Sequence, residues 1–295
     1  MTQPLPATFA LTKHHGLGND FLVLADVGVA ASMTTAQRAL LARAACDRHR
    51  GVGADGLLFA LPVGHHNAPK STGGDEAIAM RLHNADGSVA EMSGNGIRCF
   101  AQAVIDAGVV AGGIVRIATD GGLRVVVGSA SDATGTAHFR VDMGTAIVNS
   151  IEIPNSIVDH LGSARVLTVD VGNPHIVIER DPTTVAIAEF GPVIEEPYLT
   201  TKLHGINVEV VGSRPGSVDV VDMVVWERGV GVTEACGTGA CATAVAAHRW
   251  GLVGKNSMVN MPGGAVGVEL DGDRITLLGP SQFICSLTFP RLPVL

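Results

Sequence analysis

The fold of this chain is decided by Glu227–Gly239, which reads ERGVGVTEACGTG and leads directly into the helix-like run Ala240–Trp250. Cys236 stands immediately before the glycine-rich turn that opens this helix. The first backbone N–H groups of a helix have no partner within it, and they lie at the positive end of its dipole. They therefore attract a carboxylate or phosphate and lower the pKa of a neighbouring thiol. Cys236 is a candidate acid/base group or nucleophile, and a buried cysteine at a tight turn is the alternative.

The same arrangement occurs earlier in the chain. Asn84–Gly96 reads NADGSVAEMSGNG and again leads into a helix-like run. Asn84 precedes Ser93 by the same interval that separates Glu227 from Cys236. Self-similarity of this kind indicates two copies of one structural unit. We expect the two copies to direct two helix N-termini into one cleft, where one amino-acid carboxylate binds with a proton-transfer group on either side of its α-carbon.

The composition is that of a globular protein. The 295 residues are 46% hydrophobic with a mean hydropathy of +0.33, and the formal net charge of −8 argues against binding to nucleic acid or an anionic membrane. No apolar run is long enough to span a bilayer and the N-terminus lacks the features of a signal peptide, so we expect a cytoplasmic protein. His14 and His15 have no partner at metal-ligand spacing, so we expect no metal. An odd number of cysteines without close pairs indicates reduced thiols: Cys46, Cys99, Cys236, Cys241 and Cys285.

The strand-like segments favour an α/β (α+β) fold of two similar domains. Two β-branched runs within residues 114–127 flank a Gly-Gly turn, which is typical of hairpins rather than of a β-α-β alternation. We expect the strand-like tail to return to the first copy. The predicted domains are therefore residues 1–142 with the tail 283–295, and residues 143–282. The prolines in Glu189–Thr201 predict an irregular connection there.

Together these motifs resemble the diaminopimelate epimerases, which belong to the cofactor-independent two-base amino-acid racemases and epimerases. The resemblance covers nearly the whole chain, with several separate motifs in the family's order. It rests on the segments His15–Phe21, Asn84–Ser88, Ser93–Phe100, Gly172–His175, Asn207, Glu227–Gly229 and Cys236–Gly239. It implies that each domain is a barrel-like β-sheet around a central helix, with the active site in the cleft between the domains. It also implies a homodimer.

The resemblance implies an isomerase that inverts one α-carbon of LL-2,6-diaminopimelate to give meso-diaminopimelate, a precursor of lysine and peptidoglycan. One cysteine takes the α-proton and a second, on the opposite face, returns a proton. A thiolate is a usable base near neutral pH, since the reference pKa of a thiol is about 8.5 and helix N-termini lower it. Because no cofactor spreads the charge of the carbanion, oriented N–H groups must stabilise the carboxylate. The turns Gly94-Asn95 and Gly237-Thr238 supply them.

The resemblance also assigns the residues that bind the remaining polar groups of the substrate. Arg228 pairs with a carboxylate and Glu227 with an ammonium group. His175 lies near the site, where it either tunes a thiol or orients a neighbour. Four asparagines complete the set: Asn19, Asn84, Asn173 and Asn207.

The chain departs from the family at the first catalytic cysteine, which falls on Ser93. Cys99 does not replace it, because the family commonly has a cysteine there too and the position lies one to two turns into the helix. A serine hydroxyl is a far weaker acid than a thiol, so its alkoxide is scarcely populated at neutral pH without an activating partner. The hydroxyl still donates or relays a proton.

Several alternatives follow for Ser93. As a natural variant, it supports slower or direction-biased epimerisation with water or His83 as a helper. As an engineered substitution, it leaves substrate binding intact in an impaired enzyme. In a one-base relative such as an amino-acid dehydratase or lyase, Cys236 removes the α-proton and a β-leaving group departs. The last alternative is a non-catalytic binding protein. Of these, we favour the epimerase or its impaired variant.

Overall fold

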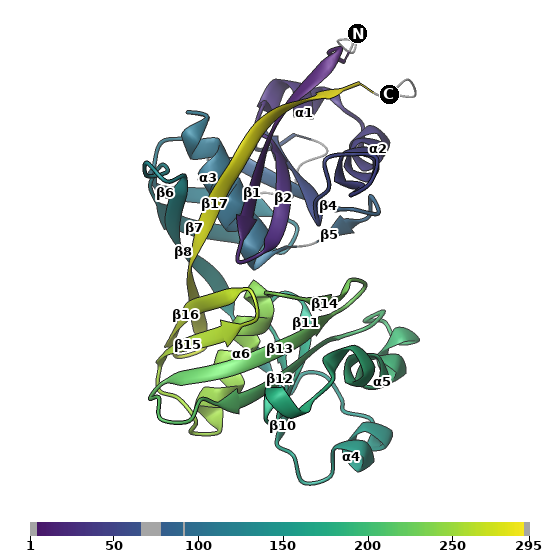
Figure 1. Cartoon of the computed structure of the whole chain (residues 1–295), viewed down its shortest axis with the longest axis vertical. Helices are drawn as coiled ribbons and strands as arrows, with labels where there is room; N and C mark the ends of the chain where they lie inside the picture. The colour runs from purple at the N-terminus through teal and green to yellow at the C-terminus, as the bar shows by residue number, and fades with distance from the viewer. Residues whose placement is uncertain (1–4, 66–77, 91, 292–295) are drawn as a thin grey trace. The chain divides into compact units, whose positions relative to one another are not determined.

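The chain forms two compact units. The computed structural model describes residues 5–65, 78–90 and 92–291, so that the end of the predicted tail, 292–295, lies outside the described residues. Unit 1 comprises the chain up to Val141 and from Gly279 onward, and unit 2 comprises Asp142–Leu278. Two long strands, β8 (Thr136–Thr145) and β17 (Arg274–Pro290), contribute to both units (Figure 1).

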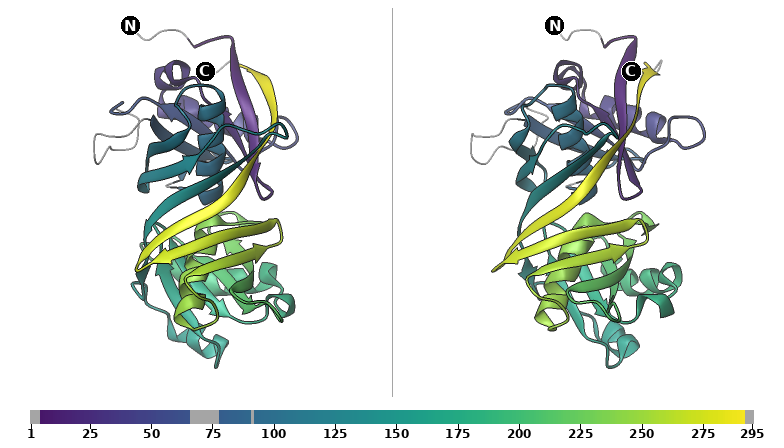
Figure 2. Two further views of the ribbon diagram at one scale, coloured as in Figure 1. Left: turned by 90° about the vertical axis from the view of Figure 1, so that its left-hand side faces the viewer. Right: turned by 60° about the vertical axis from the view of Figure 1, so that its left-hand side comes forward.

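Unit 1 is a closed barrel of paired strands. The series runs β17-β1-β2-β3-β4-β6-β7-β8, and β8 pairs back to β17. The pairs β2–β3 and β4–β6 are parallel. β1 and the C-terminal part of β17 run side by side (Figure 2). The bounds are β1 (Thr8–Gly16), β2 (Asn19–Leu24), β3 (Gly56–Leu61), β4 (Ile78–Asn84), β5 (Val89–Ala90), β6 (Gly113–Thr119) and β7 (Gly122–Gly128).

Unit 2 is built from a second series of strands, β9-β10-β11-β12-β13-β15-β16-β17. The pairs β11–β12 and β13–β15 are parallel. The bounds are β9 (Ile147–Val148), β10 (Val166–Asp170), β11 (Pro174–Glu179), β12 (Asn207–Ser213), β13 (Val220–Glu227), β14 (Gly231–Thr233), β15 (Asn256–Met261) and β16 (Gly264–Asp271).

The two units repeat one plan. The parallel pairs occur at the same places in each series, and the short strands β5 and β14 pair with β4 and β13 in the same way. The register repeats as well: Phe21 pairs with Gly56 between β2 and β3, and His175 pairs with Asn207 between β11 and β12. The predicted fold class is therefore confirmed, with two similar α/β units that each contain a barrel-like sheet.

One helix is buried within the strands of each unit. Every residue of α3 (Gly94–Asp106) from Gly94 to Ile105 is buried, and so is every residue of α6 (Gly237–Arg249) from Gly237 to Ala247. Burial on all faces places each helix inside a core, although α3 carries the buried polar side chains Asn95, Arg98 and Gln102. α6 contacts β10, β11, β12, β13, β15 and β16, so strands surround it. The N-cap residues are Ser93 for α3 and Cys236 for α6, which places both predicted catalytic side chains at the start of a buried helix.

The outer helices pack against the sheets. In unit 1, α1 (Val27–Ser32) contacts β3, and α2 (Thr35–Cys46) contacts β3 and β4. In unit 2, α4 (Asn155–Leu161) and the 3-10 helix η1 (Pro182–Thr184) precede α5 (Ile187–Leu199), which contacts β12 and β13. Among the described residues, no helix is long and apolar enough to cross a membrane.

The irregular connection predicted at Glu189–Thr201 is wrong, because α5 occupies most of it and includes Pro192 and Pro197. Ile194 and Tyr198 lie one turn apart on this helix, and both are buried in the core of unit 2. Burial of this face stabilises the helix and offsets the hydrogen bonds that the prolines remove.

Candidate active site

The sulfur of Cys236 is held at the N-terminus of α6. Its Sγ accepts the backbone N–H of Gly239 at 3.3 Å and lies 3.4 Å from Thr238 Oγ1. Cys236 is only 4% exposed. A side chain at Gly239 is excluded, because a Cβ there would lie 2.7 Å from Glu209 Oε1 and 3.2 Å from the sulfur. The glycine-rich turn therefore lets the helix N-terminus approach both the thiol and the strand beneath it.

The pKa of the Cys236 thiol is raised well above its ordinary value, so the lowered pKa expected from the helix N-terminus is wrong. Burial is the largest cause, followed by the negative charges of Glu227 and Glu209. The hydrogen bonds from Thr238 and the Gly239 N–H oppose this shift but do not overcome it. Removing a thiolate from water costs more than a helix dipole returns. The resting sulfur is therefore a neutral thiol.

Glu227 lies beside this thiol. Its carboxylate accepts hydrogen bonds from the Thr233 hydroxyl and from Cys236. Burial raises the pKa of Glu227, and the charge of Glu209 adds to the increase. Glu227 is thus a proton acceptor in direct contact with the Cys236 sulfur.

A buried histidine–glutamate pair lies beneath the N-terminus of α6. His175 Nδ1 is 2.7 Å from Glu209 Oε1, and neither residue has any exposed surface. His175 Nε2 is 3.0 Å from Asn173 Oδ1, and Asn173 Nδ2 donates to Thr238 Oγ1 at 3.3 Å. The structure therefore connects three predicted site residues, Asn173, His175 and Thr238, to Cys236. The sequence did not indicate Glu209, which stands two positions after Asn207 on β12 and so shares its face of the strand.

Two predicted substrate-binding residues are joined to each other elsewhere in unit 2. Asn207 Oδ1 accepts the backbone N–H of Arg228 at 3.0 Å, and its Nδ2 donates to the Pro174 carbonyl at 2.8 Å. The Arg228 guanidinium donates to the Leu203 carbonyl at 2.9 Å. Asn207 thus fixes the backbone that carries Arg228.

In unit 1, Ser93 occupies the position that Cys236 has in unit 2. Its Oγ accepts the backbone N–H of Gly96 at 2.9 Å. Gly96 again approaches the cap closely, because a Cβ there would lie 3.0 Å from the Ser93 Cβ. The polar side chain two residues after the cap differs between the units, because Asn95 occupies the position of Thr238. Asn95 Nδ2 donates to Asn19 Oδ1 at 3.2 Å.

A polar network orients Asn19. Asn19 Nδ2 donates to Asp55 Oδ2 at 2.6 Å, and Asp55 also pairs with Arg48 at 2.8 Å. On the other side, Arg98 donates to Asn95 Oδ1 at 2.8 Å. Asp55 and Arg98 therefore support the predicted site residues Asn19 and Asn95, and neither was predicted to do so.

Asn84 lies in a separate turn. Its Nδ2 donates to Ser88 Oγ at 3.0 Å, and Ser88 also bonds to Asp86. The neighbouring His83 faces the opposite way: its Nδ1 lies 3.0 Å from the Gly87 carbonyl, and its ring packs edge-on against Phe59. Arg38 and Arg43 of α2 lower the pKa of His83 in addition to its burial. Within the described residues, no hydrogen bond joins His83 to Ser93.

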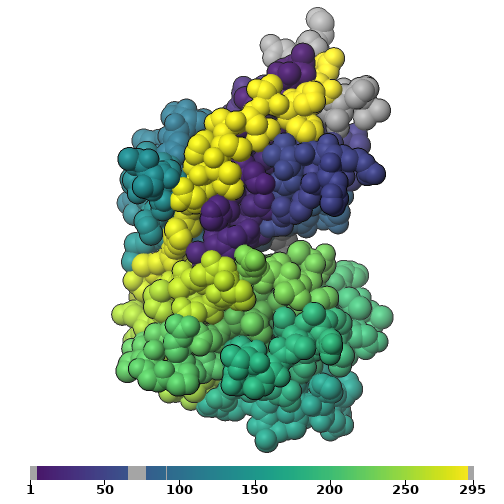
Figure 3. Space-filling view, in the orientation of Figure 1, coloured from purple at the N-terminus to yellow at the C-terminus, as the bar shows by residue number. Residues whose placement is uncertain are grey.

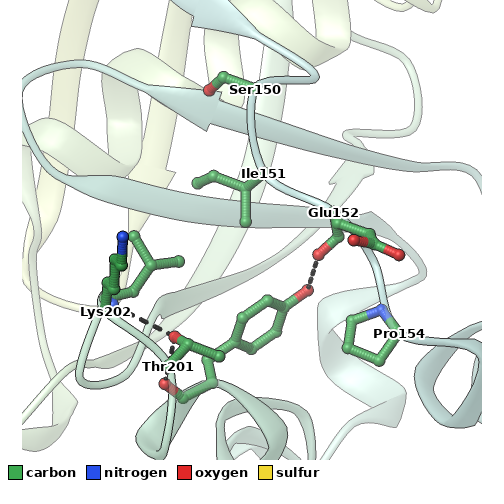
Figure 4. Close-up of a pocket in the computed structure, with 8 residues that line it drawn as sticks. Ser150, Ile151, Glu152, Pro154, Thr201 and Lys202 are labelled. Carbon is green, nitrogen blue, oxygen red and sulfur yellow. Dashed lines mark hydrogen bonds between the residues drawn. The ribbon is translucent and has the colours of Figure 1, made fainter.

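A pocket of about 550 Å³ lies away from these groups, between the segment after β9 and the end of α5 (Figure 4). Tyr198 closes one side of it and donates to the Glu152 carbonyl at 3.3 Å. Among the described residues, none of those predicted for the site line this pocket.

Comparison of the sequence with known proteins identifies one family, in both the family model and the curated relatives. A family model described as "Diaminopimelate epimerase" matches residues 11–148 and 167–284. The diaminopimelate epimerase of Synechococcus elongatus is 39% identical over 289 residues, which cover 93% of this chain and 95% of the relative. That of Desulfitobacterium hafniense is 37% identical over 287 residues, with 93% and 95% covered.

Solved structures share the fold at lower identity. A hydroxyproline epimerase from Agrobacterium vitis aligns with a TM-score of 0.71 at 17% identity, covering 100% of this chain and 95% of that one. A phenazine biosynthesis protein of the PhzF family from Bacillus anthracis aligns with a TM-score of 0.69 at 13% identity, covering 95% and 98%.

The raised thiol pKa is testable by alkylation. Because the thiolate is the reactive form, the rate of iodoacetamide modification of Cys236 should rise with pH at a midpoint above that of free cysteine. Glu227→Gln removes a neighbouring negative charge and should move the midpoint to lower pH. Mass spectrometry of the Cys236 peptide measures the rate, and Glu234→Gln, at an exposed carboxylate, should leave it unchanged. A wild-type midpoint at or below that of free cysteine would contradict the assignment.

Proposed function

Because this chain belongs to the diaminopimelate epimerase family, we propose that it inverts one α-carbon of LL-2,6-diaminopimelate to give the meso isomer, without a cofactor and in the cytoplasm. The observation that carries this proposal is the buried Cys236 sulfur, which has hydrogen-bond donors on one side and the Glu227 carboxylate on the other. This arrangement suits a group that must give up a proton and take one back.

The proton transfer at Cys236 follows from its neighbours. The thiol passes its proton to Glu227, and the thiolate is stabilised by the Gly239 N–H and the Thr238 hydroxyl. The thiolate then removes the α-proton, so that an S–H bond forms as the C–H bond breaks. The electron pair moves into the substrate carboxylate, which the N–H groups of the turn Gly237-Thr238 stabilise.

Ser93 is the second proton-transfer group in this proposal. Its hydroxyl returns a proton to the α-carbon, and the turn Gly94-Asn95 binds the carboxylate from its side. A serine hydroxyl is a far weaker acid than a thiol, so the step in which it gives up its proton and becomes an alkoxide is slow. Since the same two groups serve both directions, the loss of rate is shared by both.

The remaining polar groups of the substrate are assigned as the family resemblance implies. Arg228 pairs with the distal carboxylate, and Glu227 pairs with an ammonium group as the substrate binds, before Glu227 takes the proton of the thiol. Four asparagines bind the remaining groups: Asn19, Asn84, Asn173 and Asn207. The hydrogen bonds that already fix Asn19 and Asn207 support this assignment, because pre-oriented groups lose less entropy on binding.

The serine at position 93 favours one further candidate. A relative with a single base removes the α-proton through Cys236 and expels a β-leaving group, as a dehydratase or lyase does. Such a reaction needs no second thiol. Its substrate would be an amino acid with a β-leaving group, which diaminopimelate lacks, and its product would be a keto acid with release of ammonia rather than a stereoisomer.

The role of Cys236 is tested against a cysteine in the same helix. Cys236→Ala should abolish turnover of LL-diaminopimelate, because the group that takes the α-proton is lost. Cys241→Ala should retain most activity, since Cys241 is fully buried in the body of α6. Formation of the meso isomer, followed by chiral chromatography, measures both. Equal loss in the two variants would overturn the assignment.

Position 93 is tested in two directions. Ser93→Cys should raise kcat about 10²-fold or more, the range expected for a proton-transfer group suited to neutral pH. Ser93→Ala should lower kcat further, because it removes the hydroxyl. The same chiral assay measures both variants. Unchanged turnover in Ser93→Ala would show that water, and not Ser93, returns the proton.

We also propose that the chain forms a homodimer through the outer face of β17. This strand lies on the surface of unit 1 (Figure 3), and Ile284 on it is 47% exposed. Sedimentation should give twice the chain mass of 30.3 kDa. Ile284→Asp should shift the protein to monomer, whereas Val218→Asp, at an 85% exposed position of unit 2, should not. A monomeric wild-type protein would rule this contact out.

A further inference from the structure

A continuous series of side chains leads from Glu209 to the sulfur of Cys236. The contacts are Glu209 Oε1 to His175 Nδ1 at 2.7 Å, His175 Nε2 to Asn173 Oδ1 at 3.0 Å, Asn173 Nδ2 to Thr238 Oγ1 at 3.3 Å, and Thr238 Oγ1 to Cys236 Sγ at 3.4 Å. Glu209 begins the series, and among the described residues no hydrogen bond joins it to the sulfur or to a predicted substrate-binding group. Besides the direct effect of its negative charge on the thiol pKa, Glu209 can act on Cys236 through the other members of the series.

The two ends of His175 fix the number of its protons. The Glu209 carboxylate is an acceptor, so it requires a proton on Nδ1. The Asn173 carbonyl oxygen is also an acceptor, so it requires a proton on Nε2. With the Asn173 amide in this orientation, both ring nitrogens of His175 donate hydrogen bonds, and the Asn173 amide and Thr238 hydroxyl donate in turn toward the sulfur. The series ends on Glu227, which accepts from Cys236.

Burial explains why the pair is charged. Glu209 and His175 have no exposed surface, and Glu209 Oε2 has no hydrogen-bond partner among the described residues. A buried carboxylate with a free oxygen is costly unless a positive charge lies beside it. Such a pair adds little stability compared with apolar side chains of the same volume. We attribute the presence of the buried Glu209–His175 pair to its effect on the Cys236 sulfur.

The other unit provides an internal comparison. The repeated register places Phe21 at the position of His175, and Leu58 at the position of Glu209. Both are buried apolar residues. The barrel thus holds an apolar pair beneath the cap Ser93 and a charged pair beneath the cap Cys236. The fold itself does not need the charged pair, because its own second copy does without it.

We propose that Glu209 is a positioning residue for Cys236: it keeps His175 doubly protonated and so directs the hydrogen bonds of Asn173 and Thr238 toward the sulfur. This inference rests on the proposed acid/base role of Cys236. The ion pair is neutral as a whole, and so is a glutamine beside a neutral histidine. Replacing Glu209 therefore reverses the hydrogen bonds of the series. It also removes a negative charge that raises the pKa of the thiol, and because that change favours the thiolate, a loss of kcat identifies the effect of the hydrogen bonds.

The variant Glu209→Gln should reverse the hydrogen bonds of the series. Without the carboxylate, His175 loses one ring proton, and its Nε2 becomes a hydrogen-bond acceptor. The Asn173 amide then rotates, so that its NH2 group donates to Nε2. The Asn173 oxygen then faces Thr238, whose hydroxyl donates to it and no longer to the sulfur. The thiolate loses one donor. The expected loss in kcat is about 10- to 100-fold, the size of one hydrogen bond to a charged group, with KM unchanged.

The direct test is the ¹⁵N NMR spectrum of histidine-labelled protein near neutral pH, with the His175 signals assigned by comparison with His175→Gln. Wild type should show both ring nitrogens protonated, and Glu209→Gln should show one. Thr238→Val should keep His175 doubly protonated but lose kcat as Glu209→Gln does. Glu234→Gln, at an exposed carboxylate outside the series, should change neither.

A singly protonated His175 in the wild-type protein would overturn the inference. An unchanged kcat in both Glu209→Gln and Thr238→Val would also overturn it. The spectrum does not depend on turnover. A doubly protonated His175 in a protein that does not epimerise diaminopimelate would leave the series in place and reject the proposed function alone.

Discussion

Desolvation of one sulfur atom is the constraint on which the proposed chemistry depends. Cys236 caps a helix that is buried on all sides, so its thiol is out of water before any substrate binds. Two carboxylates, Glu227 and Glu209, raise its pKa further, and the helix N-terminus does not compensate. The thiol is therefore a proton donor at rest and a base only while its proton is held elsewhere. A strong base that forms transiently in a closed environment suits the removal of a weakly acidic α-proton.

Duplication provides the scaffold, and divergence provides the chemistry. Both units bury one helix among strands with the same parallel pairs and place a small polar residue at its N-cap. What lies beneath the cap has diverged: His175 and Glu209 in unit 2, Phe21 and Leu58 in unit 1. A thiol with a charged pair beneath it and a hydroxyl with an apolar pair beneath it are unequal partners in proton transfer. This inequality accounts for a slow proton transfer at Ser93, whichever direction the reaction runs.

The sequence predicted what depends on local pattern and missed what depends on burial. Glycine-rich turns before two helices, and their equal spacing from Asn84 and Glu227, were sufficient to predict the repeated unit and both caps. The prolines of α5 led to the wrong prediction of an irregular connection, because the packing of Ile194 and Tyr198 stabilises that helix. The predicted sign of the Cys236 pKa shift was wrong for a related reason. A sequence motif indicates a helix N-terminus and its dipole, but it does not indicate how far the thiol is removed from water. Glu209 was not predicted from the sequence, because only the pairing of β11 with β12 brings it close to His175.

Hydrogen exchange at the α-carbon distinguishes an epimerase from the alternatives in one experiment. LL-diaminopimelate incubated with the wild-type protein in D₂O should give meso-diaminopimelate with one solvent deuteron at the inverted α-carbon, with no metal or cofactor added, as followed by NMR and mass spectrometry. This result requires a group that removes the α-proton and another that returns one. Substrate that takes up deuterium at the α-carbon but keeps its LL configuration would contradict the account in favour of a one-base enzyme. Recovery of unlabelled substrate would contradict it in favour of a binding protein.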